Sequence, residues 1–131
     1  MLEQGAVVRF FYLWAREADA GEETGRKSRP TCIVVRTKTE PAMLFLFPLT
    51  SQPPKAPRIF LEVSEMECRR IGLKAPCWII LDEYNRVASN QAYDFESLQP
   101  LGTFSIGFLK KIAASIKSAS AMRRLRSVTR R

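Results

Sequence analysis

The chain has 131 residues with a formal net charge of +8, three cysteines and no histidine. This length suits a single domain with a real hydrophobic core. Without histidine, and without metal-ligand spacing among Cys32, Cys68 and Cys77, a zinc site is excluded and buried free thiols are expected. No apolar stretch approaches the roughly 18 residues of a membrane span, and no signal-peptide pattern opens the chain. We therefore expect a cytoplasmic protein that makes no membrane contact.

The first half of the chain predicts three strands. Residues 6–14 are rich in β-branched and aromatic side chains, as are residues 31–37 and 42–49. The polar segment 15–28 is too long for a tight hairpin and is expected to be a mobile loop. The turn K-T-E-P joins the second and third strands, and the prolines that follow them predict a stiff connector.

The second half begins with a strand over residues 58–63. Ser64 then has the character of an N-cap, and the short helix after it should end at Gly72. The continuous apolar run 77–81 predicts a central strand that ends at D-E-Y-N-R. Residues 98–101 are the candidate for a further short strand.

From Phe104 onward the apolar period changes from two to about 3.6. Phe104, Phe108, Ile112 and Ile116 mark one face of an amphipathic helix, which should pack against the sheet or a partner subunit. Short strands, long polar loops and one terminal helix predict a mainly β fold with a small, strongly bent sheet or partly open barrel. We expect one domain over residues 1–119.

Positive charge is concentrated at the C-terminal end. Eight of the 21 Lys and Arg residues follow Ser105, and none of the 13 Asp and Glu residues does. Residues 120–131 are therefore expected to form a basic tail outside the domain. Such a tail could bind a phosphate backbone or an acidic protein segment, or simply remain solvated.

Chemistry-bearing residues gather where the predicted hairpin opens. Arg29 enters one strand and Thr50 and Ser51 leave the next, so the hairpin brings a guanidinium close to two hydroxyls. Arginine suits bidentate contact with phosphate and stabilisation of charge that develops on phosphorus. The sequence therefore predicts a phosphate-sized site. It contains neither a dinucleotide-binding glycine motif nor a P-loop, nor a Cys-x-x-Cys pair.

Three blocks, in order and spacing, resemble the PemK/MazF toxin family: G-A-V-V-R-F, then G-E-E-T-G-R-K-S-R-P, then F-P-L-T-S. The later W-I-I-L-D-E and the helix after L-G-T-F-S agree, so the resemblance covers residues 5–116. It implies a small SH3-like barrel of the CcdB/PemK type that forms a homodimer and binds a cognate antitoxin protein. It also implies an endoribonuclease, an mRNA interferase, that cuts single-stranded RNA with neither metal ion nor cofactor.

The resemblance also assigns roles to residues. Arg29 and Thr50 match the cleaving pair, and Ser51 lies beside them. Glu22, with Glu23 as the alternative, matches the loop glutamate proposed to move a proton. The implied reaction is attack of a ribose 2′-OH on the adjacent phosphate, which leaves a cyclic phosphate and a free 5′-OH.

Further contacts to RNA are expected from groups in the loops. Arg26 and Lys27 lie in the loop before Arg29, and Asp82 matches an acid at the end of a later strand. Tyr84 could stack on a base. The family often has an arginine where this chain has Asn85, so Arg86 is the candidate for the displaced cation. The alternatives are a noncatalytic toxin on the same barrel, such as a topoisomerase poison, or a nucleic-acid-binding relative that acts through its tail.

Overall fold

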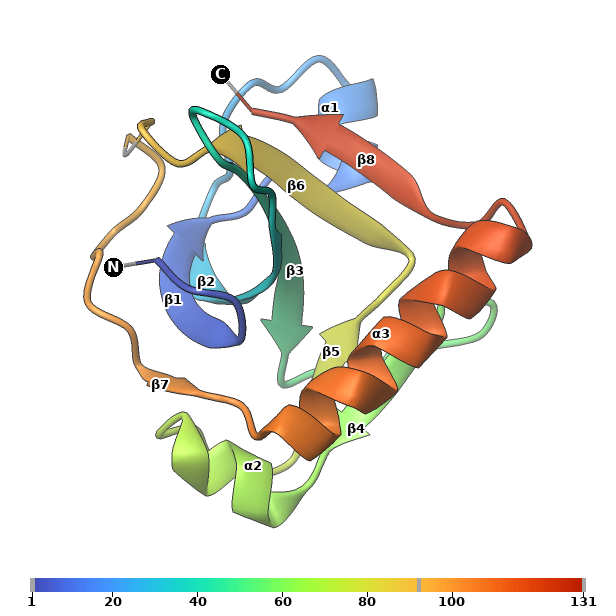
Figure 1. The fold of residues 1–131 in the computed structure, drawn as a ribbon. Coiled ribbons are helices and arrows are strands. Elements are labelled where there is room, and N and C mark those ends of the chain that lie inside the picture. Colours follow the sequence, from blue (N-terminus) through green and yellow to red (C-terminus); the bar gives the residue numbers. More distant parts are fainter. Residues whose placement is uncertain (1, 92, 131) are drawn as a thin grey trace.

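The computed structural model describes residues 2–91 and 93–130. It is mainly β, with a curled, largely antiparallel sheet that forms a half-barrel and with three helices at its margins (Figure 1). In chain order the elements are β1 (Ala6–Phe11), α1 (Ala15–Asp19), β2 (Ser28–Arg36), β3 (Met43–Thr50), β4 (Phe60–Val63), α2 (Glu65–Arg70), β5 (Cys77–Ile80), β6 (Glu83–Ala88), β7 (Gly102–Thr103), α3 (Ile106–Ala121) and β8 (Arg126–Thr129).

The strand β3 organises the sheet. One edge of β3 pairs with β2, which pairs in turn with β1. The other edge is divided, because β5 pairs with the end of β3 at Leu49 and Thr50 while β6 pairs with its beginning. The chain therefore bends sharply between β5 and β6, and this bend curls the sheet. The strand β4 continues the sheet beyond β5.

Both faces of the central strands are buried, which explains their continuous apolar runs. Side chains of one parity, such as Val7, Cys32 and Phe47, form a core beneath α2 and α3. The alternate residues, such as Val8 and Ile33, form a second core inside the curl of the sheet. The expected bent sheet is confirmed, with one core on each of its faces. The end of the sheet where β2 begins and β3 ends is called the rim here.

The predicted amphipathic helix is α3, and its apolar stripe covers the sheet. Phe104, Phe108 and Ile112 are buried, and Ile116 packs against the same core. The predicted cap of α2 is also confirmed, since the Ser64 hydroxyl accepts the N–H of Glu67 at 3.3 Å. None of the helices in the described residues has the length and apolar character needed to cross a membrane.

Three elements differ from the expectation. Residues 15–28 are not wholly a loop, because they include α1, whose first turn is closed by Trp14 N–H donating to Glu17 Oε1 at 3.1 Å. The strand predicted over residues 77–81 is confirmed as β5 and ends at Ile80, but a further strand that was not predicted, β6, begins at Glu83. The buried positions of β6 include Glu83 and Asn85, whose polar groups have partners far away in the sequence. The sequence of β6 therefore lacks the alternation of apolar and polar residues that predicts a strand. The short strand falls at Gly102–Thr103 rather than at residues 98–101.

Residues 120–131, expected as a basic tail outside the domain, are partly built into the sheet. The strand β8 pairs in parallel with β6, and Val128 is buried. Arg130 is only 3% exposed, and its guanidinium donates to the Phe11 carbonyl at 2.7 Å. This strand runs alongside β6 at the edge of the sheet and close to α1 (Figure 1), so much of the terminal charge has a structural role.

Candidate active site

The β2–β3 register brings the predicted pair together. Thr31 lies opposite Pro48, and this antiparallel register continues toward the open end of the hairpin. Arg29, in β2, then lies opposite Thr50, the last residue of β3. Residues that face each other in antiparallel strands project to the same side of the sheet. The predicted guanidinium and hydroxyl are therefore neighbours at the rim.

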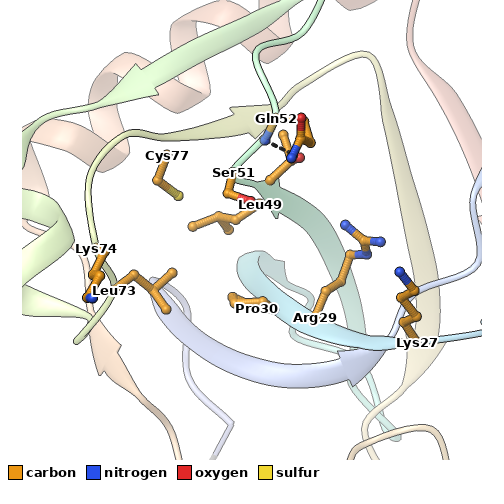
Figure 2. A pocket seen from close by; sticks show the side chains of 10 residues that line it. Lys27, Arg29, Pro30, Leu49, Ser51, Gln52, Leu73, Lys74 and Cys77 are labelled. Atoms are coloured by element: carbon orange, nitrogen blue, oxygen red, sulfur yellow. Dashed lines mark hydrogen bonds between the residues drawn. The ribbon is translucent and has the colours of Figure 1, made fainter.

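Two cavities flank this pair and share Arg29, Thr50 and Gln52. The larger, of about 450 Å³, is named here the Leu73 cavity and opens beside the core under the helices. The second, of about 340 Å³, is the Lys55 cavity and opens beside the core inside the curl. Figure 2 shows Arg29 and Leu73 on opposite sides of the first. Together the two cavities form a groove across the rim.

Cations line this groove. They come from α1, from β2 and the loop before it, from the proline-rich connector and the residues before β4, and from the segment before β5. No carboxylate is among the lining residues of either cavity. The lining cations are Arg16, Lys27, Arg29, Lys55, Arg58 and Lys74. A concave surface with one sign of charge concentrates a field that attracts anions. The groove is suited to a phosphate-bearing chain.

Arg29 is half-buried and packs against an aromatic ring. Its guanidinium lies 5.0 Å from the centre of the Trp14 ring, within cation–π range. Its Nε is buried and has no hydrogen-bond partner in the described residues. Burial lowers the pKa of Arg29; Glu17 opposes this change and Arg16 adds to it. Arg29 thus keeps unused donors in a partly desolvated place, where a charge-assisted bond to phosphate is strong.

Thr50 is held by its own turn. Its hydroxyl oxygen accepts the backbone N–H of Gln52 at 3.1 Å (Figure 2). The hydroxyl hydrogen remains free to donate to an anion, because no acceptor for it occurs within the described residues. Ser51 is exposed and lines the Leu73 cavity beside it. The structure therefore brings together Arg29, Thr50 and Ser51, with Lys27 at the margin.

The loop glutamates lie elsewhere. Glu22 pairs with Arg26 at 2.6 Å on the exposed surface, and this hydrogen bond lowers the pKa of Glu22. Glu22 and Glu23 line another cavity next to β8, together with Val128. Arg26 lines a smaller cavity together with Arg29, but it does not line the groove. Neither glutamate therefore lines a cavity that Thr50 also lines.

A carboxylate that the sequence did not single out lies closer. Glu17 is buried and lines a cavity of about 210 Å³ with Arg29, Arg26 and Lys27, named here the Glu17 cavity. Its Oε1 accepts the Trp14 N–H, and its Oε2 lies 3.6 Å from Arg26 Nε. Because the segment around Glu17 was expected to be a mobile loop, its position beside Arg29 could not be foreseen.

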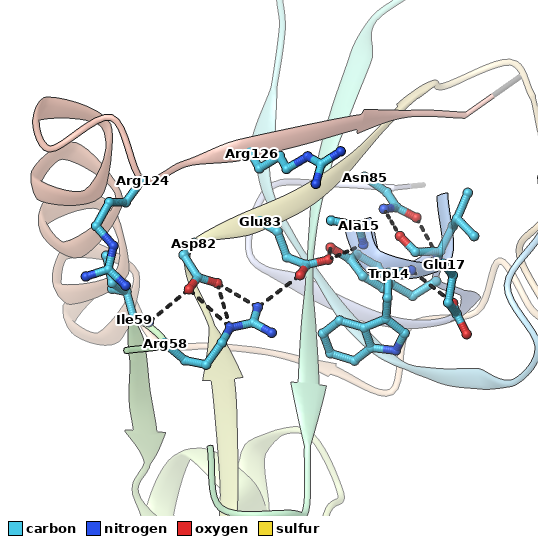
Figure 3. A network of polar contacts seen from close by, with 12 residues as sticks. Trp14, Ala15, Glu17, Arg58, Ile59, Asp82, Glu83, Asn85, Arg124 and Arg126 are labelled. Atoms are coloured by element: carbon cyan, nitrogen blue, oxygen red, sulfur yellow. Dashed lines mark hydrogen bonds and ion pairs between the residues drawn. The ribbon is translucent and has the colours of Figure 1, made fainter. Parts of the chain in front are cut away.

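The remaining predicted residues do not line the groove. Asp82 accepts hydrogen bonds from Arg58 Nη2 at 2.7 Å and from the Ile59 N–H at 3.1 Å (Figure 3), so it fixes the start of β4 to the start of β6. The ring of Tyr84 stacks on Phe45 and on Phe47 in the core, with centroids 4.8 and 5.1 Å apart. Arg86 lies on β6, opposite Phe45.

A buried polar network supports the Trp14 side of the groove. Glu83 Oε1 accepts both the Tyr12 hydroxyl at 3.0 Å and the Ala15 N–H at 2.9 Å, while Oε2 accepts Arg58 Nη2 at 3.0 Å. Figure 3 shows this arrangement beside the Trp14 ring. Glu83 therefore fixes the turn into α1, and with it the positions of Trp14 and Arg16.

Comparison with known proteins adds no assignment. No model of a known protein family matches the chain. A search of curated proteins likewise gave no match.

Proposed function

We propose that this protein is a metal-independent endoribonuclease that cuts single-stranded RNA and acts as the toxin of a toxin–antitoxin pair. The supporting observation is the juxtaposition of Arg29 and Thr50 between two cavities lined by six cations and no carboxylate. An RNA backbone is the polyanion that such a groove fits, and the sequence blocks around both residues resemble those of PemK/MazF toxins.

The chemistry would proceed by attack of a ribose 2′-oxygen on the neighbouring phosphorus. The new bond closes a cyclic phosphate, and the bond to the 5′-oxygen of the next nucleotide breaks. The Thr50 hydroxyl and Ser51 would hold phosphate oxygens in line for attack. Arg29 would stabilise the charge that develops on those oxygens and donate a hydrogen bond toward the leaving oxygen.

The proton of the 2′-OH needs an acceptor. The resemblance assigns this role to Glu22 or Glu23, but both lie in a cavity apart from Thr50. Glu17 shares the Glu17 cavity with Arg29, which supports it as the acceptor in this chain. Its buried position also lets it orient the Trp14 turn that packs on Arg29.

The finer assignments belong to the same proposal. An SH3-like barrel of the CcdB/PemK type is supported by the small curled sheet with its terminal helix. A homodimer and a cognate antitoxin follow from the resemblance. A cytoplasmic location is proposed from the sequence, which has no signal-peptide pattern and no apolar stretch of membrane-span length. A noncatalytic nucleic-acid-binding protein is the second candidate, and the absence of carboxylates from the groove lining favours it.

The test is incubation of the purified protein with a long single-stranded RNA in EDTA. Native protein should give discrete fragments with 5′-OH ends. Arg29→Ala and Thr50→Ala should each reduce the cleavage rate about 100-fold or more, as loss of a preorganised donor does. Arg69→Ala is the matched control, since Arg69 is exposed on α2 and lines none of these cavities.

A Glu17→Gln variant separates the proton acceptors. We expect it to slow cleavage strongly, while Glu22→Gln and Glu23→Gln cleave at nearly the native rate. RNA that stays intact with folded native protein, yet binds in a gel-shift measurement, would overturn the nuclease and support the noncatalytic candidate.

A further inference from the structure

The Lys55 cavity contains more positive charge than a single phosphate at Arg29 and Thr50 requires. Arg16, Lys55 and Arg58 line it in addition to Arg29, with Trp14 as its apolar wall. These cations come from α1, the proline-rich connector and the residues before β4, so three separate parts of the chain converge on one place.

The guanidinium groups of the cavity surround one indole ring. The Cζ of Arg16 lies 4.9 Å from the Trp14 centroid, that of Arg29 lies 5.0 Å away and that of Arg58 lies 5.9 Å away. Cation–π attraction holds each of them. Arg58 is also ion-paired with Asp82 and Glu83, whereas Arg16 and Arg29 form no ion pair with any residue that the structure describes. Like charges gathered in this way oppose one another, and the positive charge of Arg16 contributes to the lowered pKa of Arg29. A bound anion would relieve this repulsion.

The cations of the cavity differ in whether their charge is available to bind an anion. Arg58 is committed to Asp82 and Glu83 through ion pairs of 2.7 and 3.0 Å. Arg16 and Lys55 are exposed, and neither forms an ion pair with any residue that the structure describes. Both therefore present unpaired charge to the cavity, while Arg58 and Trp14 form its fixed wall.

The position of the cavity relates it to the proposed cleavage site. Arg29, Thr50 and Gln52 border both cavities of the groove. A nucleic-acid strand with one phosphate at Arg29 and Thr50 can therefore extend into the Lys55 cavity. Its next phosphate is the group that can meet Arg16 and Lys55.

We propose that Arg16 and Lys55 bind a second RNA phosphate, adjacent to the scissile phosphate at Arg29 and Thr50. This subsite rests on the proposed nuclease function and deepens it, because it makes the substrate a chain rather than a single phosphodiester. Loss of one charge-assisted contact corresponds to about a tenfold change in binding. A dinucleotide that lacks the second phosphate should accordingly be a poor substrate.

The experiment uses a short RNA that spans one mapped cleavage site, with a single uncharged methylphosphonate linkage moved one position at a time on both sides of it. For native protein we expect one position next to the scissile bond at which neutralisation lowers kcat/KM about tenfold. In an Arg16→Ala/Lys55→Ala double variant, the same neutral linkage should have little further effect. Arg69→Ala/Lys111→Ala is the control, because both residues are exposed and outside the groove.

The same oligonucleotides are also tested for binding by fluorescence anisotropy, with 2′-deoxyribose at the scissile nucleotide to block attack. Cleavage that is equally sensitive to the neutral linkage in native protein and in the double variant would overturn the subsite and leave the nuclease intact. If native protein cuts no RNA, the nuclease fails, and the neutral linkage is then moved along a short single-stranded RNA that native protein binds. A linkage-specific loss of affinity that depends on Arg16 and Lys55 would then still support the phosphate site, and its absence would overturn it.

Discussion

Tyr12 is a single buried residue on which the support of the groove depends. It is 1% exposed, its hydroxyl donates to Glu83, and its ring packs edge-on against Trp14 with centroids 5.0 Å apart. Burial raises the pKa of Tyr12 well above its usual value, and the negative charge of Glu83 adds to the change. In the folded protein the phenol therefore keeps its proton at a pH where an exposed tyrosine loses it.

This raised pKa predicts alkaline instability. The unfolded chain releases the Tyr12 proton at about pH 10, whereas the folded protein retains it, so the stabilisation is complete below that pH and is lost above it. Tyr12→Phe should cost about 1 kcal/mol at pH 7 for the lost hydrogen bond and should show a smaller loss of stability between pH 9 and 11. Urea unfolding at each pH measures both effects.

The free energy of unfolding of Tyr12→Phe should still fall somewhat at alkaline pH, because burial also raises the pKa of Cys77 to about 12 and raises that of Cys32. Measuring Cys77→Ala, with Tyr12 retained, gives the contribution of the Cys77 thiol to the pH dependence of stability. An identical pH dependence in native protein and Tyr12→Phe would contradict the assignment to the phenol.

At the residue scale, the sequence predicts what is local to the hairpin. Arg29 and Thr50 meet because two consecutive strands pair, and the order of the blocks suffices to foresee this. Glu17 could not be foreseen, because its place depends on a helix of only five residues, too short to show an apolar period. Tyr84 and Asp82 have local surroundings that suggest a groove, yet both are used by contacts across the fold.

At the element scale, one buried carboxylate joins two helices. Glu67 of α2 is 7% exposed and accepts both the backbone N–H of Ser105 at 2.9 Å and its hydroxyl at 2.6 Å. Ser105 is the N-cap of α3, and its oxygen accepts the Phe108 N–H at 3.2 Å. The start of α3 is thus fixed by its own cap and by the preceding helix.

Ser105→Ala should destabilise the protein by about 1–3 kcal/mol, because it removes the cap and leaves a buried oxygen of Glu67 with one partner fewer. Ser118→Ala, at an exposed position of the same helix, is the matched control and should change stability by less than about 0.5 kcal/mol. Thermal or urea unfolding measures the difference, and equal effects of the two substitutions would refute the role of Ser105.

The same scale explains which elements the sequence could predict. The α2 cap and the apolar stripe of α3 follow from nearby residues, and both were predicted. The strand β6 was not, because its buried Asn85 holds both backbone groups of Leu13, at 2.8 and 2.7 Å, from 72 residues away. A buried polar side chain that hydrogen-bonds to the backbone of a distant segment interrupts the apolar pattern from which a strand is predicted.

At the scale of the whole molecule, Arg130 joins β8 to distant segments. Its Nη1 donates to the Phe11 carbonyl at 2.7 Å and to Asn85 Oδ1 at 2.9 Å, and its Nη2 pairs with Asp94 at 2.9 Å. The guanidinium also lies 5.2 Å from the centre of the Phe10 ring. Sequence composition alone suggests a solvated tail here, because it does not show which of several arginines is buried.

Arg130→Ala should lower the free energy of unfolding by about 3 kcal/mol, because it leaves Asp94 and two acceptors in poorly solvated surroundings. Arg130→Lys should lie between this variant and native protein, since lysine keeps the charge but not the fork of donors. Arg69→Ala should have almost no effect. A loss no larger than that of Arg69→Ala would show that β8 is held without this contact.

The irregularity in the β2–β3 hairpin has an evolutionary consequence. The register shifts between Ile33 and Val35, so a bulge separates the half of the hairpin that holds Arg29 and Thr50 from the half that leads to the turn. Insertions or deletions in that turn can be absorbed without realigning the pair. Deletion of a single residue between Arg29 and Ile33 would instead turn the side chains of that half to the opposite face and place the guanidinium toward the other core. Length variation in descendants of this chain is therefore tolerated at one end of the hairpin and eliminated at the other.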